Sequence, residues 1–505
     1  MSAIMQPLEI STVVSYPLPS CYRVTHLYSV RVNATDVPVN DTVPIFENYN
    51  YCHFSFSGTI MITITACEEI ASYNISPLKL GIIGTVAGNK LTFTLASSQY
   101  LIVKINGLKE LVIVADELES NIPPSSGTGI YNVKDLPYNA DGTGMNMATN
   151  AIQAAIDDAN TGGGGIVYIP SGVYKCGNIV LKSNVSMYLE GGAVILGSGD
   201  PKDYTTHYRK NSLDMGGTWF IYTEMGATNI MIFGRGTIDG NGHYMRNMNH
   251  YLNNLIVPLK CSYFTMDGVT LRDSGLWSLI PTRSRNITIQ NVKLFNNNGI
   301  DHEADAIDIQ ECQNVQVVHV IAVAEDDTFC TKTWDEDTDI AANWPGCPEP
   351  LTDVMFDECV AWSRCATYKV GFGNCQKQSN ITFKNSTSYQ SMRAMTINHR
   401  WGAPVTENVT FENIDVEDFW PREGNSSRWL EITADSGPIK NTIIRNIKLR
   451  KVGDTTSRIT GKSTSVQVKG VVISSVSVNG EYANSLEAMN VTDINNYIDD
   501  IILTK

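Results

Sequence analysis

The feature that most constrains the fold of this chain is a short unit that repeats through its second half. The unit is a turn-forming residue, usually Asn, then alternating apolar residues, then Asn or Gly and a second short strand. Strand-like alternation in a repeat of this size, without intervening helices, predicts a right-handed parallel β-helix. We expect the shorter spacings to be one coil of three short strands and the longer spacings to include an inserted loop. The units begin, 23 to 45 residues apart, at Asn184, Asn229, Tyr263, Asn286, Asn314, Asp353, Asn380, Asn408, Asn441 and Val466.

The repeated Asn has a structural explanation. Asn tolerates the left-handed backbone conformation that a tight turn requires, and its side chain can hydrogen-bond the coil above. The many Asn-x-Ser/Thr sequences, such as the one at Asn286, are therefore weak evidence for glycosylation.

Two further regions precede the repeat. Residues 1–119 contain short period-2 patterns interrupted by Asn and Gly, which predict a small antiparallel β-sandwich with an accessory role. Residues 120–129, SNIPPSSGTG, are the best candidate for a linker, and residues 130–505 form the predicted β-helix. Residues 147–160 have helical spacing, and we expect this short helix to cover the first open edge of the strand stack.

Composition excludes several classes of protein. The net charge of −15 argues against a nucleic-acid partner, because a phosphate backbone requires a basic face. No apolar run reaches the ~18 residues of a membrane span, so no membrane partner is expected. The first residues, MSAIMQPLEI, lack the basic start and apolar middle of a signal peptide. The 11 cysteines are interpreted as small buried residues or, alternatively, as one or two disulfides among Cys347, Cys359, Cys365 and Cys375.

The candidate chemistry lies between Asp301 and Trp334, where two consecutive strands each begin with carboxylates. If these strands are neighbours in a parallel stack, Asp305 and Asp327 occupy equivalent strand starts about 4.8 Å apart, with Asp326 beside them. Like charges so placed raise one another's pKa, which gives one protonated and one ionised carboxyl group near neutral pH. Glycoside hydrolysis needs such a pair, an acid for the leaving oxygen and a base for water.

The alignment of coils also predicts which side chains face outward. In this register Asp308, Cys330 and Lys369 stack on the outer face, and Lys332 lies beside them with Gln310 and Gly371. A single Asp at a turn–strand junction most often caps the backbone. Three acids in register, with two lysines on the same face, favour a functional site. The residues predicted to stack inward are Ile307, Ile309, Phe329, Thr331, Tyr368, Val370, Met395 and Ile397.

Three motifs in the chain resemble glycoside hydrolase family 28, the polygalacturonases and their relatives. They are GRGTIDGNG at 234–242, EADAIDI at 303–309 and AEDDTFCTK at 324–332, and the resemblance extends over roughly residues 130–480. It implies an inverting hydrolase in which Asp305, Asp326 and Asp327 are the catalytic carboxylates. The family pattern makes Asp326 the general acid, with Asp305 and Asp327 holding the water.

The chain departs from the family pattern in ways that bear on substrate. Glu303-Ala304 replaces Asn-Thr, Cys365-Ala366-Thr367 replaces Gly-His-Gly, and the Arg-x-Lys that holds a uronate carboxylate is absent as such. Lys369, or His399 with Arg400, are candidates to stand in for it. The departures imply a divergent relative that cleaves an α-linked sugar other than simple pectin. Families 49 and 87, which include dextranases and α-1,3-glucanases, resemble the chain in fold and in their three-Asp arrangement.

Further residues near the acids are candidates for binding substrate. His302 and Glu303 are interpreted equally as sugar contacts or as a plain turn. Trp334, in an insertion that lengthens one coil, is a candidate sugar-stacking platform, with loop anchoring as the alternative. No cofactor and no metal are expected, since the acidic residues 335–339 lack the spacing of an EF-hand. The predicted substrate-binding set is His302, Glu303, Asp308, Lys332, Trp334, Lys369, His399 and Arg400.

These observations lead to one main hypothesis and its rivals. The main hypothesis is a glycosidase acting on a polysaccharide or oligosaccharide, in an extracellular or periplasmic location, with an intracellular location as the alternative. The rivals are a dextranase-type or α-glucanase-type hydrolase, a polysaccharide lyase, and a β-helix that binds glycans without cleaving them. The sequence leaves the sugar, the linkage and the oligomeric state open.

Overall fold

The computed structural model describes residues 11–42, 49–296, 303–335, 344–420 and 426–504. The chain divides into two compact units, Met1–Ile122 and Pro123–Lys505.

The first unit is a β-sandwich whose two sheets share one apolar core. The expected antiparallel pairing is corrected at one place, where β12 runs parallel to β6, with Ile113 opposite Cys52. The chain passes through the other sheet between these two strands, so no tight turn forces them antiparallel. One sheet contains β1 (Thr12–Ser15), β2 (Arg23–Val24), β5 (Val39–Asp41), β6 (Asn50–Ser57), β8 (Tyr73–Ser76), β11 (Gln99–Ile105) and β12 (Leu111–Glu117). The other contains β3 (Tyr28–Val32), β4 (Thr35–Val37), β7 (Ile60–Ala66), β9 (Thr85–Ala87) and β10 (Lys90–Leu95).

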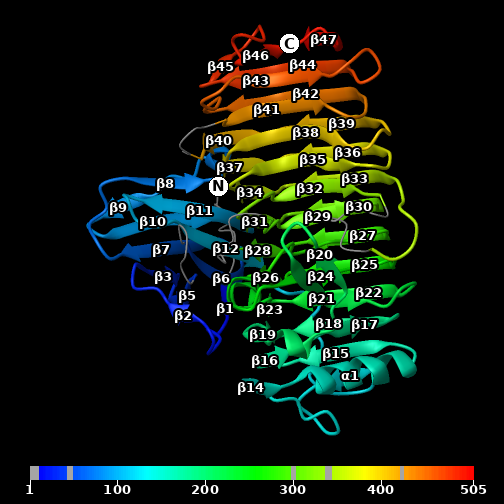
Figure 1. Ribbon diagram of the computed structural model, residues 1–505. Helices are drawn as coiled ribbons and strands as arrows, with labels where there is room; N and C mark the ends of the chain where they lie inside the picture. The colour runs from blue at the N-terminus through cyan, green and yellow to red at the C-terminus, as the bar shows by residue number, and fades with distance from the viewer. Residues whose placement is uncertain (1–10, 43–48, 297–302, 336–343, 421–425, 505) are drawn as a thin grey trace, which may run out of the picture. The chain divides into compact units, whose positions relative to one another are not determined.

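The second unit is a parallel β-helix whose strands stack coil upon coil, from β14 at one end to β47 at the other (Figure 1). A full coil contributes three strands, as β29, β30 and β31 do before β32, β33 and β34 repeat the order one coil later. The long sheet contains β13 (Ile130–Asn132), β14 (Thr143–Met147), β15 (Gly165–Ile169), β16 (Gly172–Cys176), β18 (Val185–Leu189), β19 (Ala193–Gly197), β22 (Thr228–Gly234), β23 (Thr237–Asp239), β25 (Ser262–Asp267), β26 (Thr270–Arg272), β27 (Arg285–Gln290), β28 (Lys293–Phe295), β30 (Gln313–Val318), β31 (Ile321–Ala324), β33 (Leu351–Asp357), β34 (Val360–Ser363), β36 (Gln378–Lys384), β37 (Thr387–Ser391), β39 (Thr406–Glu412), β40 (Asp415–Phe419), β42 (Ile439–Leu449), β44 (Val468–Val478), β45 (Glu481–Tyr482) and β47 (Ile498–Thr504).

Two smaller sheets complete the β-helix, and the second of them carries the candidate site on its outer face. The first contains β17 (Ile179–Leu181), β20 (Tyr208–Lys210), β21 (Met215–Thr223) and β24 (Tyr251–Val257). The second, called here the site sheet, contains β29 (Ile307–Gln310), β32 (Phe329–Thr333), β35 (Ala366–Asn374), β38 (Arg393–Trp401), β41 (Arg428–Ala434), β43 (Ser457–Gly461) and β46 (Val491–Ile494).

The repeated Asn forms a ladder of left-handed turns. Each unit start from Asn184 to Asn441 has a positive φ between 54° and 62°, including Tyr263 and Asp353. Asn side chains hydrogen-bond from coil to coil, as Asn408 Nδ2 does to Asn380 Oδ1 at 3.0 Å. The predicted structural role of the repeat is therefore confirmed.

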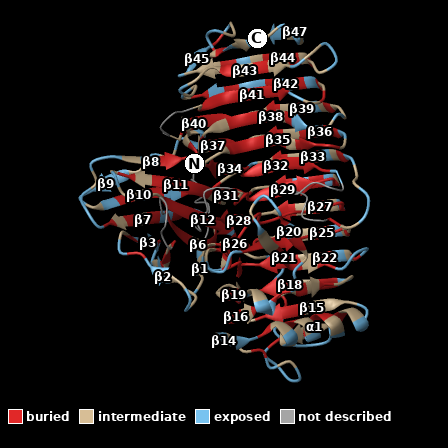
Figure 2. Cartoon of the chain, viewed as in Figure 1, coloured by how far each residue is buried: buried red, intermediate tan, exposed pale blue. Residues whose placement is uncertain are grey.

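The core of the β-helix is a column of stacked apolar side chains, which Figure 2 shows as buried strands from coil to coil. Phe356 and Phe383 stack with ring centroids 4.9 Å apart, and Phe383 stacks on Phe411 at 5.3 Å. The predicted helix is present as α1 (Thr149–Thr161). Its apolar face, which includes Ile152 and Ala155, packs into the core at the first coils, at the bottom of Figure 1.

All 11 cysteines lie among the described residues and all are free, eight of them buried or partly buried. The alternative of disulfides around the site is therefore corrected, because the inward-facing cysteines pack in the core as small apolar residues. Within the described residues, the structure has no helix that is both long and apolar enough to cross a membrane.

Candidate active site

The predicted acids lie where two neighbouring strands of the site sheet begin. Asp305 precedes β29 by two residues, and Asp327 precedes β32 by two residues. The two strands pair in parallel with Ile307 opposite Phe329, and Ala306 N donates to Asp327 O at 2.9 Å. Asp305 and Asp327 are therefore equivalent positions on adjacent coils, as the sequence register predicts.

The outer face of the site sheet carries the polar row that the sequence predicts. Asp308 lies opposite Cys330, and Cys330 lies opposite Lys369. All three side chains point away from the core, yet Lys369 is only 2% exposed and the other two are fully buried. Flanking segments therefore cover this face and exclude much of the water, which strengthens every electrostatic interaction in the site.

Lys332 holds two acids of the site together. Its Nζ lies 2.5 Å from Asp305 Oδ2 and 2.9 Å from Asp308 Oδ2, and it sits 4.6 Å from the centre of the Trp277 ring. Burial works against the charge of Lys332, but the carboxylates of Asp305 and Asp308 outweigh it and hold its pKa well above the usual value. Lys332 is therefore a charged ammonium group at neutral pH.

Lys369 makes a separate ion pair with Asp327. Its Nζ lies 2.6 Å from Asp327 Oδ2 and 3.8 Å from the centre of the Phe372 ring. Burial lowers the pKa of Lys369, but the charge of Asp327 outweighs this effect and raises the pKa above its ordinary value. Lys369 is thus a fixed cation aimed at one of the predicted catalytic carboxylates.

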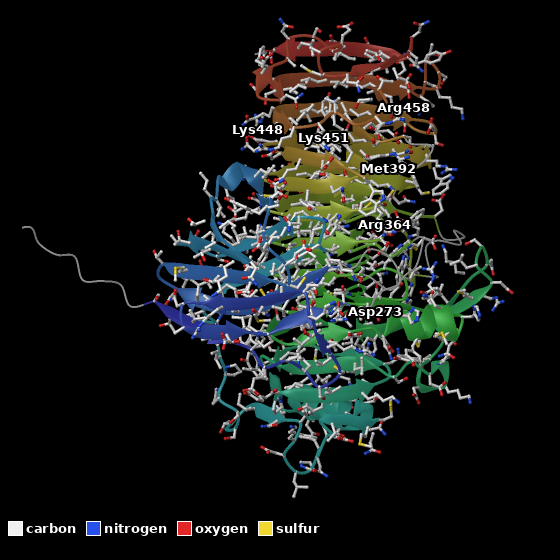
Figure 3. The ribbon with its side chains drawn as sticks, turned by 90° about the vertical axis from the view of Figure 1, so that its left-hand side faces the viewer. Asp273, Arg364, Met392, Lys448, Lys451 and Arg458 are labelled. Atoms are coloured by element: carbon white, nitrogen blue, oxygen red, sulfur yellow. The ribbon has the colours of Figure 1, made fainter. Side chains whose placement is uncertain are left out.

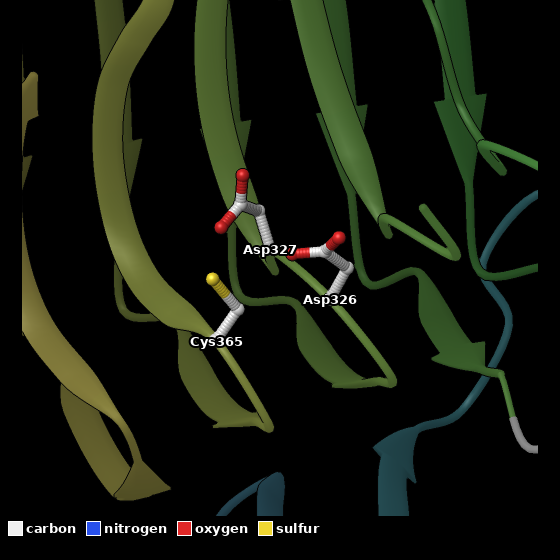
Figure 4. Close-up of side chains that lie close together, drawn as sticks. All are labelled: Asp326, Asp327 and Cys365. Atoms are coloured by element: carbon white, nitrogen blue, oxygen red, sulfur yellow. The ribbon is translucent and has the colours of Figure 1, made fainter. Parts of the chain in front are cut away.

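Asp326 is the most accessible of the three predicted acids, being half-buried. Its Oδ2 accepts a hydrogen bond from Glu303 N at 2.8 Å. Oxygens of Asp326 and Asp327 and the sulfur of Cys365 lie within 4.8 Å of one another, and Figure 4 shows the three side chains gathered at one point. These groups could contact a cation, but Lys369 already supplies a positive charge to Asp327.

The neighbouring acids have opposite pKa shifts. Burial raises the pKa of Asp326, and the charge of Asp327 raises it further. Burial also works against the charge of Asp327, but Lys369 and then Lys332 outweigh it and leave the pKa of Asp327 lowered. Asp326 therefore keeps its proton to higher pH, while Asp327 is ionised.

The pKa of Asp305 is shifted in the opposite direction from that of Asp327, its equivalent on the next coil. Burial, followed by the charge of Asp308, raises its pKa well above the usual value in spite of Lys332. The pKa of Asp308 is also raised, by burial. The two acids therefore share a proton beside Lys332, because two buried carboxylates cannot both ionise next to one cation.

The other predicted substrate-binding residues fall into distinct environments. Glu303 has a left-handed backbone, with φ of 62°, and its Oε1 pairs with Lys210 Nζ at 3.0 Å. Arg400 is exposed on the outer face of β38. His302 lies outside the described residues.

Two predicted contacts are corrected. Trp334 is 1% exposed and packs with Trp277 and Trp344, so its ring presents no open face to a sugar. The alternating strand pattern turns His399 inward, where it is fully buried and its Nε2 lies 2.6 Å from Pro404 O. Burial lowers the pKa of His399, so it is a neutral packing residue.

The structure adds residues that sequence reasoning missed. Lys210 reaches the site from β20, a strand far earlier in the chain, and no local pattern signals its contact with Glu303. Arg393 and Arg428 lie opposite each other on adjacent coils, both within 3.4 Å of Glu431 Oε2. The register of β38 and β41 could have revealed this pair, since the two strands repeat the same pattern.

The GTIDGNG motif includes β23 and the turn that follows it, in the long sheet and not in the site sheet. Asp239 Oδ1 accepts from Asn241 N at 2.9 Å, and Asp239 Oδ2 pairs with Arg272 Nε at 3.0 Å. Nearby Asp273, labelled in Figure 3, is half-buried, and desolvation together with the charge of Asp239 raises its pKa to about 7. These contacts agree with a structural interpretation of the motif.

Fold and site together define a parallel β-helix protein with a buried cluster of carboxylates and lysines on the outer face of one sheet. Residues 166–344 match the model of the family described as glycosyl hydrolases family 28. The matched segment contains Asp305, Asp326, Asp327 and Lys332, and it ends before Lys369. The resemblance drawn from the sequence motifs is thus confirmed for this part of the chain.

Individual relatives agree with the family match. A probable polygalacturonase from Vitis vinifera is 27% identical over 218 residues, which are 39% of this chain and 43% of that protein. An exo-poly-alpha-D-galacturonosidase from Dickeya chrysanthemi is 34% identical over 139 residues, 25% of this chain and 22% of that protein. The matches thus span less than half of the length of these curated relatives. The structure of Dex49A from Penicillium minioluteum shares the fold, with a TM-score of 0.63 at 14% identity, over 97% of this chain and 96% of that one.

Proposed function

We propose that this protein is a glycoside hydrolase that cleaves an α-linked polysaccharide or oligosaccharide with inversion, through Asp305, Asp326 and Asp327. The observation that carries the proposal is a pair of neighbouring acids in different environments, a half-buried Asp326 and a buried Asp327 that is paired with Lys369. Asp326 has a raised pKa and Asp327 a lowered one, and both lie just before β32. An acid–base pair with this difference matches what hydrolysis of a glycosidic bond requires.

The geometry suggests a role for each acid. Asp326, protonated and the most accessible, donates its proton to the leaving glycosidic oxygen. Asp327, kept ionised by Lys369, accepts a proton from the attacking water. Asp305 orients that water. Asp305 and Asp308 share one proton beside Lys332, so their remaining negative charge is balanced by the lysine. Breaking the glycosidic bond and adding water across it needs no further reactant.

The substrate class is part of the proposal. The relatives named as a probable polygalacturonase and an exo-poly-alpha-D-galacturonosidase favour a pectin-like glycan, and the absence of the Gly-His-Gly sequence at 365–367 favours a different α-linked sugar. An extracellular or periplasmic location would suit a polysaccharide substrate. A screen of polysaccharides with reducing-end detection separates these possibilities.

The decisive experiment uses two matched substitutions. Asp326→Asn removes the proposed acid, and we expect turnover to fall about 10²- to 10⁴-fold with no loss of fold. Asp415→Asn is the control, because Asp415 is likewise an acid near a strand start but lies on a different sheet, where it is buried and paired with Arg450 Nη2 at 2.7 Å. The control should lose stability but keep turnover. Near-wild-type turnover in Asp326→Asn, on a substrate that the wild-type protein cleaves, contradicts the assignment.

The stereochemistry is tested separately by NMR of the anomer released first. Direct displacement by water inverts the configuration at the anomeric carbon, whereas a covalent intermediate would give retention. First release of the anomer with retained configuration would overturn the single-displacement mechanism and leave glycoside hydrolysis in place.

The lyase alternative is disfavoured by the state of the lysines. A lyase needs a neutral base beside the sugar, but the pKa values of Lys332 and Lys369 are both raised by their carboxylate partners. An unsaturated product absorbing in the near ultraviolet would favour the lyase. Glycan binding without product, unchanged when Asp305, Asp326 and Asp327 are all substituted by Asn, would favour a binding protein.

A further inference from the structure

Next to Lys369, two aromatic rings and an arginine gather toward the ends of β35 and β38. The Arg400 guanidinium lies 5.4 Å from the centre of the Phe372 ring and 5.0 Å from that of Trp401, and the two rings meet edge to face at 5.8 Å. Trp401 is 37% exposed, Arg400 is exposed and Phe372 is half-buried. We call Phe372, Arg400 and Trp401 the aromatic platform.

The platform adjoins the catalytic centre through one side chain. Lys369 Nζ lies 3.8 Å from the centre of the Phe372 ring and 2.6 Å from Asp327 Oδ2. The lysine ammonium thus contacts both the ring and the carboxylate that would accept a proton from water. A sugar ring lying on the platform would therefore be next to the sugar whose bond is cleaved.

The strands hold the platform in a fixed position. Phe372 pairs with His399 and Gly373 pairs with Trp401, with a bulge between these two pairs. A Cβ at Gly373 would come within 2.6 Å of the ring of the buried Trp334, so glycine lets Trp334 pack there. The Trp334 ring lies 6.1 Å from that of Trp401 and supports it from behind. Trp334, which the sequence suggested as a sugar-stacking platform, thus packs near Trp401 of the aromatic platform.

Arg400 is the part of the platform that points to a ligand. Among the described residues, it forms no ion pair with any carboxylate, whereas Arg393 and Arg428 both lie against Glu431. Its guanidinium instead lies near two aromatic rings, and the side chain is exposed. A planar guanidinium with free donors matches a carboxylate in a two-point contact.

We propose that Phe372, Arg400 and Trp401 form a sugar-binding subsite next to the catalytic carboxylates. In this subsite the rings stack on the C–H face of one sugar, and Arg400 pairs with an acidic group on it. The proposal rests on the proposed function for the position of the cleaved bond, but the binding itself does not require cleavage. It assigns sugar stacking to Trp401 and recognition of charge to Arg400.

Calorimetric titration of the full chain carrying Asp326→Asn tests the subsite. The probes are trigalacturonate, its methyl ester and isomaltotriose. The Asp326→Asn substitution is present in every variant so that little probe is cleaved during the titration. Trp401→Ala should weaken binding of every probe that binds by about 3- to 10-fold, because all present a C–H face. Trp401→Phe should recover part of the loss. Arg400→Gln should weaken only trigalacturonate.

Tyr263→Asn is the matched control. Tyr263 is an exposed aromatic residue, 59% exposed, at a left-handed turn where other coils carry Asn. It should leave the affinity for all probes unchanged. Thermal unfolding of each variant shows whether the fold is intact, since loss of Trp401 also uncovers Trp334.

The outcomes separate this proposal from the proposed function. Unchanged affinity in Trp401→Ala, or no binding of any probe at millimolar concentration, overturns the subsite even where Asp326→Asn abolishes turnover. Equal losses for trigalacturonate and its ester in Arg400→Gln overturn the charge recognition and leave only stacking. Normal turnover in the Asp326→Asn background overturns the proposed function, and the effect of Trp401→Ala on binding still decides the subsite.

Discussion

Replacing Lys369 by methionine should change stability and chemistry together. Lys369 is 2% exposed, and Asp327, its partner at 2.6 Å, is 3% exposed. Asp327 Oδ1 has no hydrogen-bond partner among the described residues, so Oδ2 and its lysine carry the pairing. Methionine keeps much of the length of the chain but removes the ammonium group. The substitution therefore leaves a buried carboxylate without its cation.

The size of the effect follows from burial. Removing one partner of a buried pair destabilises a protein by about 3–5 kcal/mol, because the remaining charge stays desolvated. The matched control is Lys451→Met. Figure 3 labels Lys451, which lies on the upper coils in that view. Lys451 Nζ lies 2.7 Å from Asp418 Oδ1, but these side chains are 61% and 41% exposed. Water replaces an exposed partner, so the control should cost only about 0–1 kcal/mol.

The dependence on pH identifies Asp327 as the cause. In the wild-type protein its pKa is lowered, so its pairing stabilises the fold above the unfolded value of about 3.9 and is lost as the pH falls through the folded value. Without Lys369, burial raises the pKa of Asp327. The stability of the variant then falls as the pH rises through that raised value. The deficit relative to wild type should therefore grow from pH 4 to pH 7.5.

Urea unfolding followed by tryptophan fluorescence at pH 4 and pH 7.5 measures this deficit for both variants. Turnover of Lys369→Met should also fall, because a protonated Asp327 cannot accept a proton from water. A deficit equal at the two pH values, or no larger than that of Lys451→Met, would refute the reasoning. Restored stability in Lys369→Arg, with its charge retained, would support it.

Three further predictions concern the acid, the turn ladder and the platform. Turnover should decline as the pH rises through the raised pKa of Asp326, since the proposed acid loses its proton, and a profile of kcat against pH checks this. Asn408→Ala should cost about 1–2 kcal/mol more than Asn408→Gly in urea unfolding, because glycine accepts φ of 57° without strain and alanine does not. Gly373→Ala should destabilise the fold by about 1–3 kcal/mol, measured in the same way, because its Cβ would approach the Trp334 ring to 2.6 Å.

The stacking of the β-helix could be predicted because each coil repeats the same pattern of inward-facing residues and turn residues. The period of two fixes which side chains face inward, and the Asn at each unit start fixes where one coil begins. Together they gave the register that places Asp308, Cys330 and Lys369 in one row, which the strand pairing confirms. The same register brought Asp305 and Asp327 to equivalent positions. Where the chain is repetitive, counting residues is enough to place a side chain.

The insertions could not be placed in this way. Trp334 follows directly from β32, yet its burial depends on Trp344, later in the same insertion, and on Trp277, from an earlier coil. Lys210 reaches Glu303 across more than ninety positions of sequence, and nothing local marks the contact. His399 was misread for a simpler reason: a polar residue at an inward position of β38 looks like a site residue until the neighbouring strand shows it buried.

The balance of charge in the site explains how it can hold both a proton donor and a proton acceptor. Each lysine neutralises one carboxylate, since Lys369 pairs with Asp327 and Lys332 is shared between Asp305 and Asp308. In a covered site the acids in excess of the cations keep protons, because burying an unpaired charge costs more than protonation. The pKa values of Asp305 and Asp326 are accordingly raised. Only Asp326 among these is half-exposed, so we infer that it alone can pass its proton to a substrate. Lys369 belongs to the coil in which Cys365-Ala366-Thr367 replaces the family's Gly-His-Gly, and its ammonium group gives that coil a cation in contact with Asp327.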